Sequence, residues 1–127
     1  MLVDDKFRIG TLIDKANESL AAAELLTDNG QYEEAVLRCY HAVFFSLRAF
    51  LKKKNITPEK TSDSLSEFKK NFVDTKSVPK TLYEDLTAVI NAGGFDVSID
   101  SVAIDEAFAR SVYEKADRFF SEISDRI

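Results

Sequence analysis

Residues that break helices are scarce in this chain and fall at a few positions. Its 127 residues include only four glycines and two prolines, and a chain with so few breakers favours long helices. The interruptions lie at Asn29-Gly30, Pro58, Pro79 and Gly93-Gly94. We therefore expect an all-α protein, a bundle of four to five up-and-down helices, that forms one domain over residues 1–127.

Between these breaks, apolar residues recur at helical spacing. The break at Asn29-Gly30 is so short that the two helices beside it should form an antiparallel hairpin. Pro79 suits the first turn of a later helix. Strand signals are weak, and the best alternating run, residues 95–100, is interpreted as a connector. The expected helices cover residues 5–28, 31–54, 63–72, about 79–93 and 101–125.

Two of these helices have well-defined apolar faces that we assign to the core. Cys39, the one cysteine, is interpreted as a small buried hydrophobic residue. The apolar face of the second helix comprises Val36, Tyr40, Val43, Leu47, Phe50 and Leu51, and that of the last helix comprises Phe108, Val112, Ala116, Phe119, Phe120 and Ile123.

The overall charge limits the classes of function. The net charge is −5 and the isoelectric point about 4.9, whereas a protein that binds nucleic acid through its overall charge is basic. RNA or a nucleotide would therefore need a local basic patch. The acidic start lacks an apolar run and no stretch is long enough to span a bilayer, so we expect a cytoplasmic protein without membrane contact.

The second helix carries an unusual second face. Opposite its core face, residues spaced three and four apart form a polar–aromatic stripe. Ala42 and Ala49 border this stripe and would allow close approach of another helix. The stripe consists of Arg38, His41, Phe45, Arg48 and Lys52.

Three interpretations of the stripe remain open. A neighbouring helix of the same bundle could cover it. It could be a homodimer interface centred on Phe45, since aromatic residues and arginine are favoured in interfaces. It could also bind nucleotide or RNA, with Arg38 and Arg48 meeting phosphate, Phe45 stacking a base, and His41, the one histidine, moving a proton. One cysteine and one histidine do not make a zinc site, and nothing in the sequence asks for a metal or cofactor.

Several segments together resemble the HEPN family of small helical domains, and in particular its small stand-alone prokaryotic members. The second helix has a tyrosine, a small residue, an aromatic pair and then Arg-Ala-Phe-Leu. Its end, Lys54-Asn55-Ile56, its lead-in, residues 29–35, and the segments Thr61–Phe68 and Gly94-Phe95-Asp96 also match the pattern. The resemblance extends over nearly the whole chain.

The resemblance implies a four- to five-helix bundle that commonly forms a homodimer. It also implies a partner protein, since many such domains sit beside a minimal nucleotidyltransferase in toxin–antitoxin pairs. Active members are metal-independent ribonucleases that use an arginine, a polar residue directly after it, and a histidine one to two turns further on. The corresponding residues here are Arg38 and His41, which would meet their copies across a dimer cleft.

The sequence departs from this motif in ways that count against nuclease activity. Cys39 stands where the polar residue is expected, Phe45 stands where a histidine is frequent, and no histidine lies near Ser62. Asn91 and Ala92 stand where an arginine is common. We therefore expect a HEPN-like binding module, homodimeric and paired with a nucleotidyltransferase or a toxin–antitoxin-type partner, and keep a ribonuclease using Arg38 and His41 as the alternative.

Overall fold

The computed structural model of the protein describes residues 2–58, 61–93 and 104–127. Every regular element in these residues is helical, which confirms the all-α fold class. The residues of the expected connector at 95–100, and of the turn at Gly94-Phe95-Asp96, lie outside the described residues. The elements are α1 (Leu2–Asp28), α2 (Tyr32–Lys53), α3 (Thr61–Phe68), a π-helical turn η1 (Lys69–Val73), α4 (Lys80–Gly93) and α5 (Glu106–Ser124).

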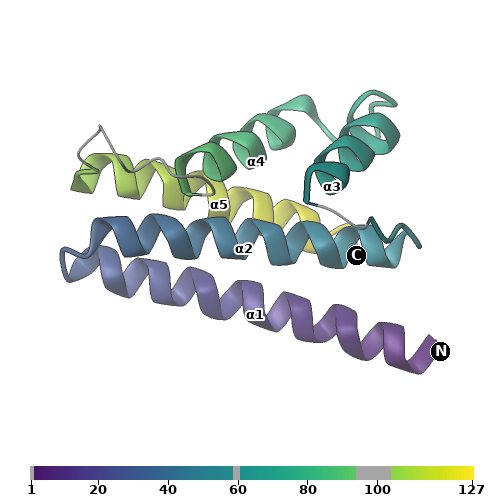
Figure 1. Ribbon diagram of the computed structural model, residues 1–127, viewed down its shortest axis with the longest axis horizontal. Helices are drawn as coiled ribbons and strands as arrows, with labels where there is room; N and C mark the ends of the chain where they lie inside the picture. Colours follow the sequence, from purple (N-terminus) through teal and green to yellow (C-terminus); the bar gives the residue numbers. More distant parts are fainter. Residues whose placement is uncertain (1, 59–60, 94–103) are drawn as a thin grey trace.

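Helix α2 is the central element of the bundle. It packs against α1 on one side and against α4 and α5 on the other, while α1 also contacts α5. Figure 1 shows α1 and α2 side by side as an antiparallel pair, α4 running back along the opposite side, and α5 returning in the direction of α2. This is the expected up-and-down arrangement, with the short α3 placed at one end.

The α1–α2 hairpin forms because the chain reverses tightly at Gly30. This glycine has a φ of +79°, a left-handed conformation that costs glycine little. The Gln31 amide donates to the Leu26 carbonyl at 2.8 Å and the Gly30 amide to that of Thr27 at 3.1 Å, the two bonds of a Schellman cap. Residues equally far from Gly30 along the two helices are therefore expected to lie side by side.

A second cap of the same type ends α2. Asn55 takes the left-handed conformation with a φ of +63°, and the Ile56 amide donates to the Leu51 carbonyl at 2.9 Å. Asparagine is the usual substitute for glycine at this position. The turn brings Ile56 back against the bundle, where it packs beside the core.

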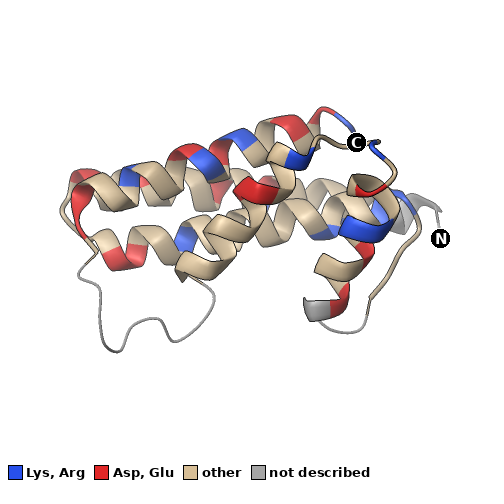
Figure 2. Ribbon diagram, turned by 90° about the horizontal axis from the view of Figure 1, so that it is seen from above, with Lys and Arg blue, Asp and Glu red and all other residues tan. Residues whose placement is uncertain are grey.

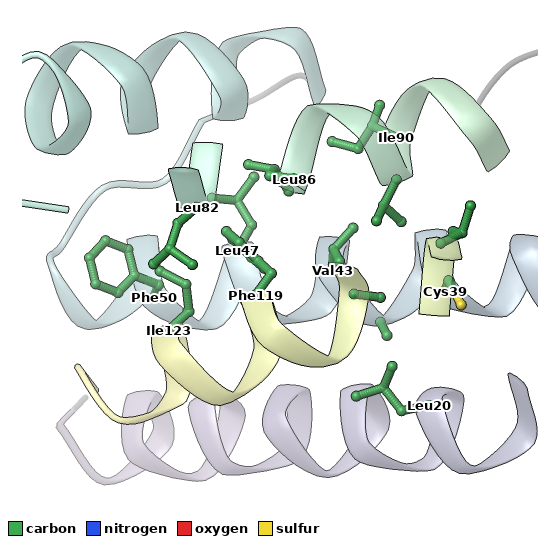
Figure 3. Close-up of a cluster of buried hydrophobic side chains, with 14 of the residues drawn as sticks. Leu20, Cys39, Val43, Leu47, Phe50, Leu82, Leu86, Ile90, Phe119 and Ile123 are labelled. Carbon is green, nitrogen blue, oxygen red and sulfur yellow. The ribbon is translucent and has the colours of Figure 1, made fainter. Parts of the chain in front are cut away.

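The predicted core faces meet between the helices. Figure 3 shows Leu20 of α1, Val43 and Leu47 of α2, Leu86 of α4 and Phe119 of α5 directed into one shared apolar space. Burial on this scale is the main stabilising contribution to such a bundle.

Phe68 at the end of α3 fastens the short helix to this core. It is fully buried, and its ring lies 5.8 Å from that of Phe50 and 6.0 Å from that of Phe119, both edge-on. Phe72 of η1 adds a further edge-on contact with Phe50 at 4.8 Å. These offset aromatic pairs are favourable geometries. Aromatic contacts therefore stabilise the packing of this short helical segment against the core.

Several predicted boundaries were wrong, and each has a local cause. The third helix was expected to continue to residue 72, but its α-helical part ends at Phe68 and a π-helical turn follows. Pro79 precedes α4 instead of lying within its first turn, and its carbonyl accepts from the Leu82 amide at 3.0 Å. Helix α5 was expected from residue 101, but it begins after Asp105, whose carboxylate caps the Phe108 amide at 2.9 Å.

Three residues assigned to core faces are less buried than expected, among them Phe120, which is half-buried beside the core. Phe108 lies in the first turn of α5 and stays 40% exposed, while Tyr40 is half-buried at the edge of the contact between α2 and α4. Cys39, in contrast, is buried as predicted. Burial raises the pKa of its thiol to about 12, because the thiolate would lose its hydration in an apolar environment. Cys39 is therefore a packing residue.

Candidate functional site: the outer face of helix α2

The stripe lies at the surface of the bundle. Arg38 and Arg48 are exposed, while His41, Phe45 and Lys52 are half-buried. The interpretation that a helix of the same bundle covers the whole stripe is therefore wrong for the two arginines. Since α2 is α-helical throughout from Tyr32 to Lys53, the spacing of three and four residues does align the five side chains along one side, as predicted.

One edge of the stripe packs against α1. The Lys15 ammonium of α1 lies 5.8 Å from the centre of the Phe45 ring, a cation–π distance. Ala42 and Ala49, one turn before and after Phe45, are fully buried. These small residues were expected to allow close approach of another helix, and both are packed inside the bundle of this chain.

His41 sits in an environment that favours its neutral form. Its ring lies 5.8 Å from that of Tyr40 and 6.4 Å from that of Phe45. Partial burial, followed by the positive charge of Arg38, lowers the pKa of His41 below its usual value, and Glu34 opposes this shift. A neutral imidazole beside a guanidinium can accept a proton near neutral pH. The predicted Arg38–His41 pair is therefore electrostatically coupled in the fold.

A groove opens beside the C-terminal half of α2. Its cavity volume is about 530 Å³, within the range of small-molecule and short-peptide pockets. Its lining comes from the N-terminal half of α1, the C-terminal half of α2, the turn after α2 and the first turn of α3. We call this the α1–α2 groove; it is lined by Phe7, Arg8, Thr11, Leu12, Phe44, Arg48, Leu51, Lys52, Ile56, Thr57, Pro58 and Ser64.

The fold divides the predicted site residues into two groups. Arg48 and Lys52 line the groove together with Arg8, whereas Arg38, His41 and Phe45 do not. Arg38 and Arg48 are ten positions apart on one helix, roughly 15 Å along its axis. One compact ligand therefore does not touch both arginines.

Arg8 and its neighbours on α1 were missed by sequence reasoning. The available signal was the position of the turn. Lys15 and Phe45 are each 15 positions from Gly30 and do meet, and by the same rule Arg8 and Lys52, each 22 positions from Gly30, share the groove.

The arginines of the protein fall into two classes. Arg110, Arg118 and Arg126 each pair with at least one carboxylate, and Figure 2 shows acidic and basic segments alternating along the helix that leads to the C-terminus. Within the described ranges, the remaining three arginines make no ion pair: Arg8, Arg38 and Arg48. Moreover, α2 contains no acidic residue after Glu34. The outer side of α1 and α2, which carries Arg8, Arg38 and Arg48 and is called the α1–α2 face, thus holds three arginines without a described ion pair on an acidic protein.

Other chemistries find little support in the described part of the chain. No group of three or more histidine, cysteine or acidic side chains there is placed to hold a metal ion. None of the helices described combines the length and apolar character needed to cross a bilayer. The chemistry available on the α1–α2 face is that of guanidinium, ammonium, imidazole and aromatic groups.

The fold, the stripe on α2 and the α1–α2 groove define a small helical-bundle protein with basic and aromatic residues on its surface. A HEPN domain model matches residues 9–126, so the chain belongs to the HEPN domain family, as the resemblance predicted.

The chain is also similar to individual proteins from archaea and bacteria. It is 31% identical over 121 residues to a protein of Methanocaldococcus jannaschii named "Putative toxin MJ0605", covering 94% of this chain and 89% of that protein. It is 34% identical over 98 residues to "Putative toxin MJ0142" of the same organism, covering 75% of this chain and 67% of that protein. A "UPF0332 protein" of Thermotoga maritima is 38% identical over 68 residues, which cover 54% and 52% of the two chains.

Proposed function

We propose that the protein is the HEPN component of a toxin–antitoxin-type pair and acts as a homodimeric binding module. The names of its two relatives in Methanocaldococcus jannaschii support this class of function. The observation that carries the proposal is the surface stripe of α2, where the half-buried Phe45 lies between the exposed Arg38 and Arg48. A large aromatic side chain beside arginines is typical of an interface.

In this proposal two copies associate through the stripe, and a nucleotidyltransferase or similar antitoxin binds the dimer. A two-fold contact through α2 brings like charges of the two copies together. Salt screens such repulsion, so dimerisation should strengthen as the salt concentration rises, unlike an interface held by opposite charges.

The test is the solution mass measured by light scattering. The wild type should have twice the chain mass of 14.3 kDa, and Phe45→Asp should halve it. Phe108→Asp is the matched control, because Phe108 is an exposed phenylalanine on α5, outside the stripe. Phe45→Ala, which removes the ring without adding a charge, should also lower the mass and keeps the test valid if Phe45→Asp does not fold. A wild-type monomer at every salt concentration would exclude the dimer.

A second candidate function is metal-independent ribonuclease activity, favoured by the coupling between Arg38 and His41. Because the pKa of His41 is lowered by burial and by Arg38, the imidazole can act as a general base while the guanidinium holds a phosphate. The test compares RNA cleavage by the wild type, His41→Ala and Arg38→Gln. Cleavage that persists in His41→Ala would rule out this assignment.

A further inference from the structure

The α1–α2 groove combines two features that a ligand must match. Its lining contains three cationic residues, Arg8, Arg48 and Lys52, and no acidic residue among those described. Neither arginine has a carboxylate partner in the described ranges, although every arginine of the C-terminal segment does. The groove therefore holds two arginines, Arg8 and Arg48, that make no ion pair with a described residue.

The second feature is apolar surface. Phe7 lines the groove and is 73% exposed to solvent, and Phe44 of α2 lines it as well. An exposed phenylalanine beside a pocket is a common mark of a protein–protein contact. The apolar lining residues are Phe7, Leu12, Phe44, Leu51, Ile56 and Pro58.

We propose that the α1–α2 groove binds a short acidic segment of a partner protein, anchored by a bulky apolar side chain. The carboxylates would pair with Arg8 and Arg48, and the anchor would pack between Phe7 and Phe44. Arginine suits carboxylate recognition because its planar guanidinium offers two parallel donors. This inference rests on the proposed function, since it names the part of a protein partner that this surface recognises.

The observations favour a peptide over a nucleic acid. A polyanion would extend beyond a cavity of about 530 Å³ onto the surface of a chain whose net charge is −5, and that field repels it. A short peptide can confine its negative charge to the groove. The apolar lining also matches side chains that a sugar–phosphate backbone lacks.

The test begins with selection of binders from a random peptide library displayed on phage, using the full-length protein. Selected peptides should carry net negative charge and at least one bulky apolar residue. Arg8→Glu and Arg48→Glu should each weaken binding of a selected synthetic peptide by at least about tenfold, measured by fluorescence anisotropy. Lys80→Glu is the matched control, because Lys80 is an exposed basic residue of α4 outside the groove and the stripe; it makes the same change in net charge and should change affinity little.

Phe7→Ser separates the apolar contribution from the charge. Because Phe7 is largely exposed, this change should leave folding intact and still weaken the peptide. Selected peptides without excess acid, or affinity unchanged by both groove reversals, would overturn the proposal. So would displacement of the peptide by oligouridylate or pyrophosphate at the peptide's own concentration, which would assign the groove to phosphate. The solution mass of each variant is measured as well. Because Arg8 lies in the groove but not in the stripe, weaker peptide binding by Arg8→Glu at unchanged mass is loss of the groove alone, so it is distinguishable from loss of the dimer.

Discussion

One substitution, glycine to alanine, should have opposite effects at two helical positions of this protein. Gly10 lies in α1, and a Cβ added there meets nothing within 4 Å. Alanine at this position should stabilise the protein by up to about 1 kcal/mol, because glycine is the poorer helix former. Gly93 is the last residue of α4, where helix propensity alone predicts that alanine would also stabilise the protein.

At Gly93 the structure instead predicts that alanine destabilises the protein, because α4 crosses α2 there. A Cβ on Gly93 would lie 2.9 Å from the Val36 carbonyl oxygen and 3.0 Å from the Tyr40 Cβ, well inside the roughly 3.5–4.0 Å of an ordinary contact between carbon atoms. One of these neighbours is backbone, so the helices must separate. Such overpacking costs roughly 1–3 kcal/mol, more than the gain in propensity.

The assay is thermal and urea unfolding of the two variants beside the wild type. For a domain of this size, each kcal/mol corresponds to a shift in Tm of roughly 3–5 °C. Gly93→Ala should therefore lower Tm by several degrees, and Gly10→Ala should raise it slightly. The reasoning would be refuted if Gly93→Ala were as stable as the wild type or more stable. Loss of stability in Gly10→Ala would equally contradict it.

Three further predictions follow from the buried and charged groups. The thiol of Cys39, whose pKa is raised to about 12 by burial, should react with Ellman's reagent only when the protein unfolds; rapid reaction of the native protein would contradict this. The pKa of His41 is lowered in the folded state, so the folded state binds fewer protons. The contribution of His41 to the free energy of unfolding should be present above the pKa of about 6.5 that the residue has in the unfolded chain. It should be lost as pH falls below that pKa. NMR titration should show the pKa rising in Arg38→Gln. Arg118→Met should destabilise the protein by about 1–3 kcal/mol in urea unfolding, because the buried Asp85 carboxylate would lose both of its 2.7 Å bonds; an unchanged midpoint would show that water replaces them.

Much of the fold was accessible to sequence reasoning because helix formation is local. The apolar spacing in α2 identified Val43, Leu47 and Phe50 as core residues, and all three are buried. The turn at Gly30 was recognisable because a left-handed residue at a helix end is a property of the local backbone. The errors fell at helix ends, where a single hydrogen bond, such as that from the Phe108 amide to Asp105, decides the boundary.

Only part of the candidate site could be predicted from the sequence. The sequence identified Arg48 and Lys52 because they share one face of one helix, but it missed Arg8 and Phe7, which join them from α1. It also left open what lies beside Phe45, where Lys15 of α1 in the same chain approaches the ring. Helical periodicity predicts which residues share a face of one helix, but it does not predict which other helix packs against that face.

The amino-acid sequence by itself determined that this protein is an all-helical bundle of the HEPN family with a polar–aromatic stripe along its second helix. Only the tertiary structure decided that α1 supplies the other wall of a cationic groove. It also decided that Gly93 is required for the close contact of α4 with α2, and not only for ending a helix. The physical reason is the same in both cases. Burial along a helix follows from its own residues, whereas a groove or a helix crossing depends on how two surfaces meet in space.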